Sequence, residues 1–232
     1  MNQKKLILSI LIVGLSTVGA SAGLTPIDTT GWSVEDYGPF EGSVSVTYRG
    51  TSDNAIWIEL DKEFNSDVFV GGDYGQPAAI KFVLTNSQAV NFAPNIVIAE
   101  ELIVNNTGIN WLDFHMTLSW DFFNYDPYVG FDPQYIFAAD LPPYNPFQTV
   151  DFADYIGLNG MPVSLNFDDG QVADGETFKP GYYGSDDNYV RIVTDMDEGQ
   201  YFILKEWPTI PEPTTLLLLS GGFVALRFMK QR

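Results

Sequence analysis

The sequence predicts an all-β protein whose folded part is an antiparallel β-sandwich, flanked by an N-terminal signal helix and a C-terminal hydrophobic helix. Two observations predict the sandwich. Apolar and polar residues alternate with period two in several short segments, the pattern of strands that are buried on one face. Turn-forming residues recur roughly every eight to twelve positions between these segments, a spacing typical of sandwiches. Away from the chain ends, no long segment shows the period of a helix.

The strands of the folded part, residues 23–209, are expected to follow a lead-in at 23–40 in which Trp32 and Tyr37 are packing anchors. Most of these segments are bounded by Gly, Asn, Asp or Pro, residues that favour turns. The predicted strands lie at 43–49, 55–60, 67–70, 77–84, 95–104, 111–120, 161–167, 189–194 and 200–207. Residues 121–160 interrupt this series, and we expect a loop region there with a helical turn within 151–157.

The most regular alternation lies at 111–120, where one face of the predicted strand carries Leu112, Phe114, Met116, Leu118 and Trp120. Such regularity predicts a central strand. A loop that contains Asn and Gly precedes it at 105–110, and these residues tolerate the positive φ of tight turns. The sequence therefore predicts a hairpin between 95–104 and 111–120.

The composition excludes several function classes. The chain has no cysteine, which excludes disulfides, thiol nucleophiles and zinc–thiolate sites. All 30 acidic residues, but only six of the 11 Lys and Arg, lie between the two apolar terminal segments, giving that stretch a formal charge of −24. Nucleic acid is excluded as a partner because it binds basic surfaces. The acidity favours either solubility of an exported protein or screening by bound cations.

Residues 1–22 have the three parts of a secretory signal peptide. Lys4 and Lys5 supply the positive start, residues 6–18 form the apolar part, and Ala20 and Ala22 frame a cleavage site of small residues. The alternative is an N-terminal membrane anchor, for which the apolar part is short. We expect export through the Sec pathway and cleavage by signal peptidase after Ala22.

Residues 210–232 combine a short polar motif, an apolar segment and a basic end. In that order these parts are Pro211, Glu212 and Pro213; the uncharged residues Thr214–Leu226; and Arg227, Lys230 and Arg232. The uncharged residues make a helix of about 20 Å, whereas the hydrocarbon core of a bilayer is ~30 Å thick. The segment is therefore marginal as a permanent span, and its basic residues suit the cytoplasmic side. The alternative is a plain C-terminal anchor.

This order of parts resembles the PEP-CTERM sorting signal of Gram-negative-type bacteria. The resemblance covers residues 211–232 and rests on the Pro-Glu-Pro-Thr motif, the leucine run at 216–219, Gly221-Gly222 and the basic end. It implies recognition by an exosortase-type membrane enzyme, removal of the tail, and release or attachment of the body at the cell surface or in the extracellular matrix. It also implies a bacterium that makes exopolysaccharide and a biofilm. The basic cluster departs from the family pattern because it is interrupted after Arg227.

The loop region has the composition of a candidate carbohydrate site. Residues 121–152 hold ten aromatic residues, five Asp, five Pro and no basic residue. Ligand sites combine apolar walls with a few polar groups, and sugar sites commonly pair aromatic faces with carboxylates. The candidate rings and polar partners are Tyr125, Tyr128, Phe131, Tyr135, Tyr144 and Phe147, with Asp126 and Asp132. The alternative is that the rings cover one end of the sandwich.

Calcium is the one candidate cofactor. Calcium takes six to eight oxygen ligands, mostly from Asp, Glu and backbone carbonyls. Two acidic clusters qualify by composition: Asp168, Asp169, Asp174 and Glu176, and then Asp186, Asp187 and Asn188. Neither matches the spacing of the common calcium-binding loop. Solvation of an acidic surface remains the alternative.

No catalytic residues are predicted. His115 is the one histidine of the chain and shares a strand face with Asp113, but the chain lacks the Gly-x-Ser-x-Gly elbow of many serine hydrolases. A glycosidase needs two carboxylates about 5 to 10 Å apart across a sugar, and 30 acidic residues do not identify such a pair.

The sequence thus predicts a non-catalytic, exported surface or matrix protein that associates with exopolysaccharide. Two other functions remain open: a carboxylate-dependent polysaccharide hydrolase at the cell surface, and a structural subunit that self-associates through sheet edges. Residues 103–118 are also similar to a motif of exported β-sandwich bodies with the same tail. This second resemblance implies the fold and no chemistry.

Overall fold

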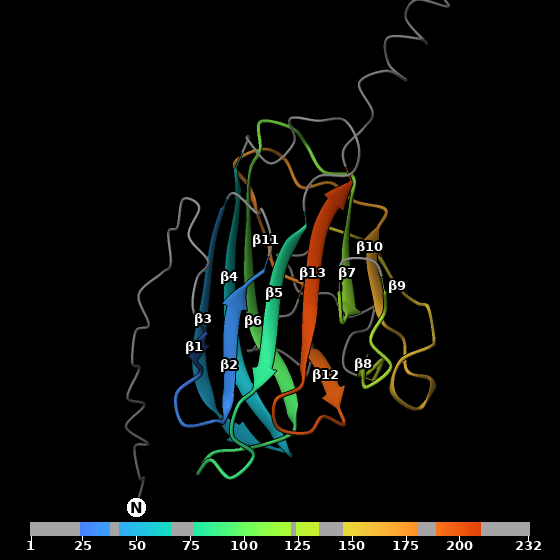
Figure 1. Cartoon of the computed structure of the whole chain (residues 1–232). Coiled ribbons are helices and arrows are strands. Elements are labelled where there is room, and N and C mark those ends of the chain that lie inside the picture. The colour runs from blue at the N-terminus through green and yellow to red at the C-terminus, as the bar shows by residue number, and fades with distance from the viewer. Residues whose placement is uncertain are drawn as a thin grey trace, which may run out of the picture.

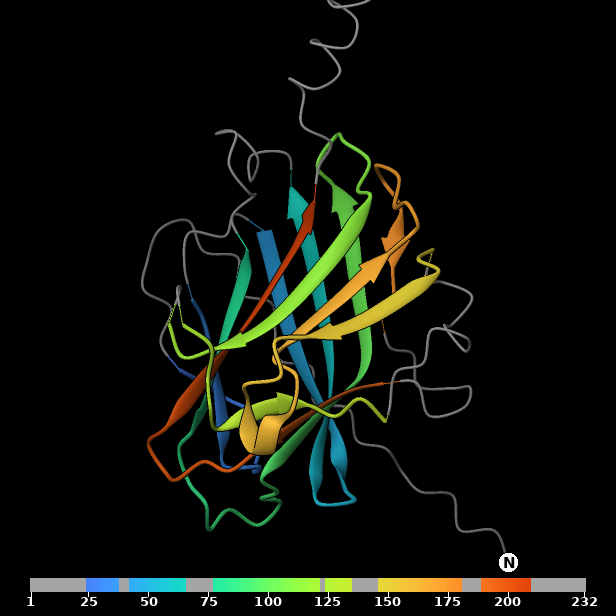
Figure 2. The same ribbon diagram turned by 90° about the vertical axis from the view of Figure 1, so that its right-hand side faces the viewer.

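The computed structural model describes residues 24–37, 42–65, 77–121, 124–134, 146–180 and 189–209. These residues form two β-sheets that lie face to face (Figure 1; Figure 2). The predicted all-β class is confirmed, and the two-sheet arrangement is consistent with a β-sandwich. The predicted terminal helices and the strand at 67–70 lie outside the described residues.

The first sheet has seven antiparallel strands in the order β1-β2-β5-β13-β7-β10-β9. In that order the strands are Thr25–Pro26, Trp32–Asp36, Ala78–Leu84, Tyr201–Thr209, Asp113–Ser119, Ser164–Asp168 and Thr149–Ala153. β7 lies between β13 and β10, so the central position predicted for this strand is confirmed. Three strands of this sheet were not predicted: β1 and β2 in the lead-in and β9 in the loop region, where Pro, Gly and Asp mask the alternation.

The second sheet has six strands, with β3-β4-β6-β12-β8 in order and β11 paired to β6. These strands are Gly42–Ser52, Ala55–Asn65, Asn95–Asn106, Val190–Thr194, Val129–Phe131 and Thr177–Phe178. β4 and β6 run parallel, so the prediction of an entirely antiparallel fold is wrong. The reason is the path of the chain, because β5 lies between them in sequence and belongs to the other sheet.

The predicted hairpin between residues 95–104 and 111–120 is also wrong. β6 pairs with β4, β12 and β11, whereas β7 pairs with β13 and β10 of the opposite sheet. The loop does turn at Gly108, whose φ is +77°. It then crosses between the sheets and places Trp111 in the core, where the indole Nε1 donates to Thr107 Oγ1 at 3.2 Å. Asn and Gly therefore predicted the turn but not the pairing of the strands.

The structure of the loop region also differs from the prediction. The helical turn expected within 151–157 is a short 3-10 helix, η3, at Leu158–Gly160. Residues 149–153 instead form β9, which pairs with β10. The segment between β9 and η3 contains Asp154, whose φ is +55°. A residue in this left-handed region ends a strand and reverses the chain.

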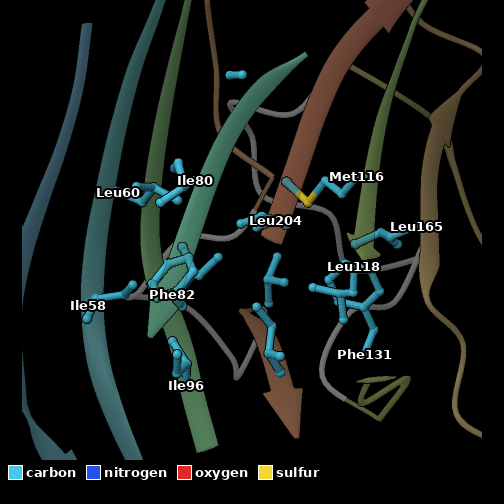
Figure 3. Close-up of a cluster of buried hydrophobic side chains, with 14 of the residues drawn as sticks. Ile58, Leu60, Ile80, Phe82, Ile96, Met116, Leu118, Phe131, Leu165 and Leu204 are labelled. Carbon is cyan, nitrogen blue, oxygen red and sulfur yellow. The ribbon is translucent and has the colours of Figure 1, made fainter. Parts of the chain in front are cut away.

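The core fills the space between the sheets. Figure 3 shows Ile58, Leu60 and Ile96 of the six-stranded sheet near Ile80 and Phe82 of the seven-stranded sheet. The same cluster continues through Leu204, Met116, Leu118 and Leu165 of the seven-stranded sheet. The predicted anchor Trp32 is buried, and its Nε1 donates to the carbonyl of Ala93 at 2.9 Å. Tyr37 is half-buried. Large apolar side chains of this kind contribute about 1.5–3 kcal/mol each when fully buried.

A second part of the core is aromatic. A continuous series of ring contacts, with centroids 5.0–6.3 Å apart, joins Phe64, Trp111, Phe114, Phe178, Phe147 and Phe167. Most of these pairs are edge-to-face, the geometry that aromatic quadrupoles favour. Strands of both sheets and the crossing loop contribute rings, so this cluster fixes how the two sheets meet.

Candidate functional site

Exposed rings gather in one part of the described chain. Four of its five exposed aromatic side chains are Trp120, Tyr125, Tyr128 and Tyr155, with exposed fractions of 53, 40, 51 and 59 %. The fifth, Tyr201, lies on β13 and has the Lys81 ammonium over its ring. Exposed apolar groups that collect in this way mark interaction sites more often than scattered ones do. These four residues are named the aromatic surface below.

Two loops carry the aromatic surface. One follows β7 and leads into β8, and the other runs from β9 through η3 to β10. Figure 2 shows both loops side by side in the lower part of the molecule, facing the viewer. The Tyr125 hydroxyl joins them by donating to Asp154 Oδ2 at 2.9 Å, and Ser164 Oγ donates to the same oxygen at 2.7 Å. Asp154 therefore links a ring of one loop to the first residue of β10.

Glycines allow the two loops to approach each other closely. A Cβ on Gly157 would lie 2.3 Å from the carbonyl oxygen of Val129. A Cβ on Gly130 would lie 2.4 Å from the Cβ of Met161. Neither distance is compatible with a side chain at these positions, so glycine is required by packing. The loops are thus held as a fixed pair, which suits a preformed binding surface.

The polar groups of the site are acidic. Asp154 is exposed beside Tyr125, and the exposed Asp195 donates its backbone N–H to the Tyr128 carbonyl at 3.0 Å. Burial, together with the hydrogen bond to Asp154, raises the pKa of the Tyr125 phenol. The phenol therefore stays a donor to Asp154 at neutral pH. Rings beside carboxylates can stack on a sugar ring and accept hydrogen bonds from its hydroxyl groups.

The structure agrees only partly with the predicted carbohydrate residues. Tyr125 and Tyr128 are exposed, as a site requires, whereas Tyr135 and Tyr144 lie outside the described residues. The prediction is wrong for three others, because Phe131, Phe147 and Asp126 are buried. Phe131 packs in the core on β8 and Phe147 in the aromatic cluster, so their apolar surface is already covered.

The predicted polar partners stabilise turns. Asp126 Oδ1 accepts from the backbone N–H of Tyr128 at 2.8 Å, and burial raises the pKa of its carboxyl. Asp132 Oδ1 accepts from the backbone N–H of Gln134 at 3.1 Å. Both are turns in which an Asp side chain mimics the backbone. The carboxylate beside the rings is Asp154 instead.

Three residues of the site were missed from the sequence: Trp120, Tyr155 and Asp154. Trp120 continues the apolar alternation of β7 by one position beyond the end of the strand, and was therefore assigned to the core face. Tyr155 and the exposed Ile156 are adjacent apolar residues in a loop, a pattern that neither a strand nor a helix face explains. These two adjacent apolar residues were the sequence signal for an exposed site in this loop.

The predicted calcium residues hold backbone groups in place. Asp174 Oδ1 accepts from Gly108 N at 2.8 Å, and Glu176 Oε2 accepts from Ala173 N at 3.0 Å. Asp168 ends β10, and Asp169 follows it with a φ of +58°. Within the described part of the chain, no group of three or more His, Asp or Glu side chains converges on one metal position. Asp186, Asp187 and Asn188 lie outside it, and calcium binding stays a prediction.

His115 lies in a polar cluster on the outer face of β7. Its Nδ1 lies 2.7 Å from Asn166 Oδ1, and its Nε2 lies 3.0 Å from Thr209 Oγ1 and 3.3 Å from Asp113 Oδ1. Trp207 packs against the imidazole. Both ring nitrogens are occupied by neighbours from β10 and β13, which gives the histidine a role in joining three strands.

The direction in which pH changes the stability of this cluster follows from the pKa of His115. Burial alone would lower the pKa of His115, but the hydrogen bonds to Asp113 and Asn166 and the charges of Asp113 and Asp168 raise it above 6.5. The stability from His115 is then fully present below pH 6.5 and lost as the pH rises through the folded pKa. We expect a loss of about 0.5–1 kcal/mol over that rise, measured by urea unfolding.

Two variants test whether His115 causes this pH-dependent loss of stability. His115→Gln should remove this pH-dependent loss, and Asp113→Asn should reduce it, because the charge that raises the histidine pKa is gone. Burial alone would raise the pKa of Asp113, but hydrogen bonds to His115 and Thr209 lower it below 3.8. The contribution of Asp113 is therefore lost only as the pH falls below 3.8. Equal pH profiles for wild type and His115→Gln above pH 6.5 would contradict the assignment.

A buried charged layer is the other unusual feature of the molecule. Lys62 of β4, Glu101 of β6 and Glu206 of β13 point between the sheets, and their side chains are fully buried. Lys62 Nζ donates to Glu101 Oε1 and to Glu206 Oε2. The other oxygen of each carboxylate has no hydrogen-bond partner among the described residues. Groups of this kind are costly to bury.

The sequence contained a signal for this layer. In β4 the core-facing residues are Ile56, Ile58, Leu60, Lys62 and Phe64. Lys62 thus occupies the core position of a regular alternation that continues past residue 60, where the predicted strand ends. Glu206 follows Phe202 and Leu204 in the same way on β13.

Comparison of the chain with protein-family models, with curated proteins and with solved structures finds no match. Among the residues that the structure describes, no helix is long and apolar enough to cross a bilayer. A fold supports many functions, so the function has to be argued from the site itself.

Proposed function

We propose that this chain is an exported bacterial surface or matrix protein that binds polysaccharide without catalysis. The single observation that carries the proposal is the aromatic surface, whose four exposed rings lie on two loops joined by Tyr125 and Asp154. Exposing these rings to water is unfavourable. A ligand that covers their faces would recover this energy.

The charge of the chain narrows the ligand class. The Asp154 carboxylate accepts hydrogen bonds, Asp195 is exposed beside Tyr128, and the residues between the terminal segments carry a formal charge of −24. A polyanion would be repelled by this field. A neutral, hydroxyl-rich glycan offers apolar ring faces to the aromatic side chains and donors to the carboxylates. The proposed ligand is therefore a neutral exopolysaccharide.

Binding is favoured over hydrolysis by the position of the paired carboxylates. Glu101 and Glu206 share Lys62 as a partner, but their side chains are fully buried. A glycosidase requires its two carboxylates to flank a bound sugar, and this pair is covered by both sheets. At the aromatic surface, the Asp154 carboxylate already accepts two hydroxyl groups, from Tyr125 and Ser164.

The binding test uses neutral glycans and single-ring variants. Trp120→Ala and Tyr155→Ala should each weaken binding roughly two- to tenfold, since one aromatic contact contributes about 0.5–1.5 kcal/mol. Their melting temperatures should stay close to that of the wild type because both side chains are exposed. The matched control is Tyr201→Ala, an exposed ring outside the aromatic surface, which should bind as the wild type does. Absence of binding by the folded wild type to an array that includes the host's own polysaccharide would refute the proposal.

The export part of the proposal rests on the terminal segments alone. It names Pro211, Glu212 and Pro213 as the recognition motif of an exosortase-type enzyme, with the segment after them held transiently in the inner membrane. Intact-mass analysis of protein from the native host should find a species that begins at Gly23 and ends near Pro213. Pro211→Ala and Glu212→Ala should retain the tail. A wild-type chain that keeps its full tail would instead indicate a plain anchor.

A further inference from the structure

We propose that Lys62 and Glu206 react with each other in the folded protein to form an intramolecular amide cross-link, assisted by Glu101. Lys62 Nζ contacts a carboxylate oxygen of each glutamate, and all three side chains are fully buried. An amine held against a carboxyl group inside a closed core has the positioning that makes an intramolecular reaction fast. This inference goes beyond the proposed function and does not depend on it.

Neighbouring core positions of three strands bring the three residues into contact. On β6, Lys62 is paired with Ile103, and Glu101 lies two positions earlier, opposite Leu60 of β4. Glu206 follows Leu204 by two positions on β13, in the opposite sheet. Figure 3 shows Leu60 and Leu204 among the side chains that fill the core between the two sheets. The reacting groups therefore come from different sheets and meet between them.

The protonation states suit amide formation. Burial and the neighbouring charge of Glu101 raise the pKa of Glu206 well above its ordinary value, and the opposing charge of Lys62 only partly offsets this. The raised pKa favours the neutral acid of Glu206, the form of a carboxyl group that an amine can attack. Glu101 accepts from the same Nζ and is placed to take a proton from the ammonium, which leaves the nucleophilic amine.

The reaction balances without another reactant. A proton passes from the Lys62 ammonium to Glu101, and the neutral amine attacks Cδ of the Glu206 acid. The Nζ–Cδ bond forms and a Cδ–O bond breaks. The departing hydroxyl leaves with the second amine proton as one water molecule. The products are an amide with one N–H, a protonated Glu101 and water, with no change of oxidation state.

The surroundings favour the product. Ionised Lys62 and Glu101 are desolvated in the core, where burying charge is costly, and the product replaces them with a neutral amide and a neutral acid. One oxygen of each glutamate lacks a partner among the described residues, so the unreacted cluster is not fully satisfied. Apolar neighbours Leu60, Phe64 and Leu204 exclude the water that would reverse the reaction.

The cross-link would stabilise a chain that has no cysteine. It would join residues 144 positions apart and link the six-stranded sheet to β13 of the seven-stranded sheet. Closing a long loop lowers the entropy of the unfolded chain. β13 ends at Thr209, directly before the C-terminal segment, so force applied through that segment would reach the cross-link after three residues.

The test is the intact mass of the folded full chain, measured after denaturation. We expect the wild type to be lighter than its sequence by one water molecule, and digestion to give a branched peptide that joins Lys62 to Glu206. Lys62→Arg and Glu101→Gln should have their full sequence masses. The matched control is Lys81→Arg, whose lysine pairs with Glu35 at 3.2 Å but is partly exposed, and which should lose water as the wild type does.

Two results would overturn the proposal. The first is a folded wild type with its full sequence mass. The second is a loss of water that persists in Lys62→Arg, which would place the dehydration elsewhere, for example in a succinimide at Asp169-Gly170. If a variant fails to fold, peptide mapping of the wild type still shows whether Lys62 and Glu206 are joined. Neither result affects the aromatic surface, so failure of the cross-link and failure of sugar binding are separable.

Discussion

Replacing Lys62 by methionine is expected to lower the free energy of unfolding by about 3–5 kcal/mol at neutral pH, because removal of one partner strands a buried charge. Before any cross-link forms, Lys62 is the cation of the buried charged layer, and both of its partners are fully buried. Methionine has a similar length and keeps the core filled, so the loss reports the charge and the cross-link that depends on it. Denaturant unfolding of both proteins measures the difference.

The pH profile identifies the cause of this loss. The Lys62 charge lowers the pKa of Glu206, so without Lys62 the folded pKa rises further. A carboxyl with a raised folded pKa contributes stability that is fully present below the unfolded value of 4.5, and loses it as the pH rises through the folded pKa. The variant should therefore be most stable in acid and weaken as the pH increases.

The matched control removes all three charges. Lys62→Met combined with Glu101→Leu and Glu206→Leu leaves no charge in the layer, and should recover part of the stability lost by Lys62→Met alone. A loss below about 1 kcal/mol for the single variant, or a loss that does not change with pH, would contradict the account of a costly charged layer.

Replacing Phe114 by alanine is expected to cost about 3–5 kcal/mol of unfolding free energy, the usual range for a large aromatic side chain removed from a core. Phe114 lies on the central strand β7 and is fully buried. Its ring contacts Phe64, Trp111 and Phe178 at centroid distances of 6.1, 6.0 and 5.1 Å. These rings come from β4, the crossing loop and β11, so the cavity would lie where the two sheets meet.

The control for Phe114 lies two residues earlier in the chain. Leu112 belongs to the same apolar alternation, but its side chain is 45 % exposed because it precedes the strand. Leu112→Ala should change the free energy of unfolding by less than about 0.5 kcal/mol. Similar losses for the two variants, measured by thermal or urea unfolding, would contradict the assignment of Phe114 to the central aromatic cluster.

The sequence predicted the strands well and their partners poorly, for a physical reason. Alternation reports which face of a strand is buried, and it located β3, β5, β6, β12 and β13 within a few residues. It carries no information on which strand lies alongside. The Asn and Gly around residue 108 therefore predict a hairpin, although the chain crosses there to the other sheet.

Predictions of site residues were wrong where they rested on composition alone. The aromatic segment indicated the right region, and Tyr125 and Tyr128 are exposed there. Phe131 and Phe147 are buried in the same region, because a short strand and a loop turn their side chains inward, which composition does not report. The strand predicted at 55–60 is too short, because the alternation of β4 continues through Lys62 to Phe64.

We propose that the aromatic surface holds the exported protein in a polysaccharide matrix. The most direct test is the distribution of the protein between matrix and medium in the native host, for the wild type and for a Trp120→Ala, Tyr155→Ala double variant expressed at the same level. We predict that the wild type remains with the matrix and that the variant moves to the medium while keeping its melting temperature. An unchanged distribution for a folded double variant would contradict the claim.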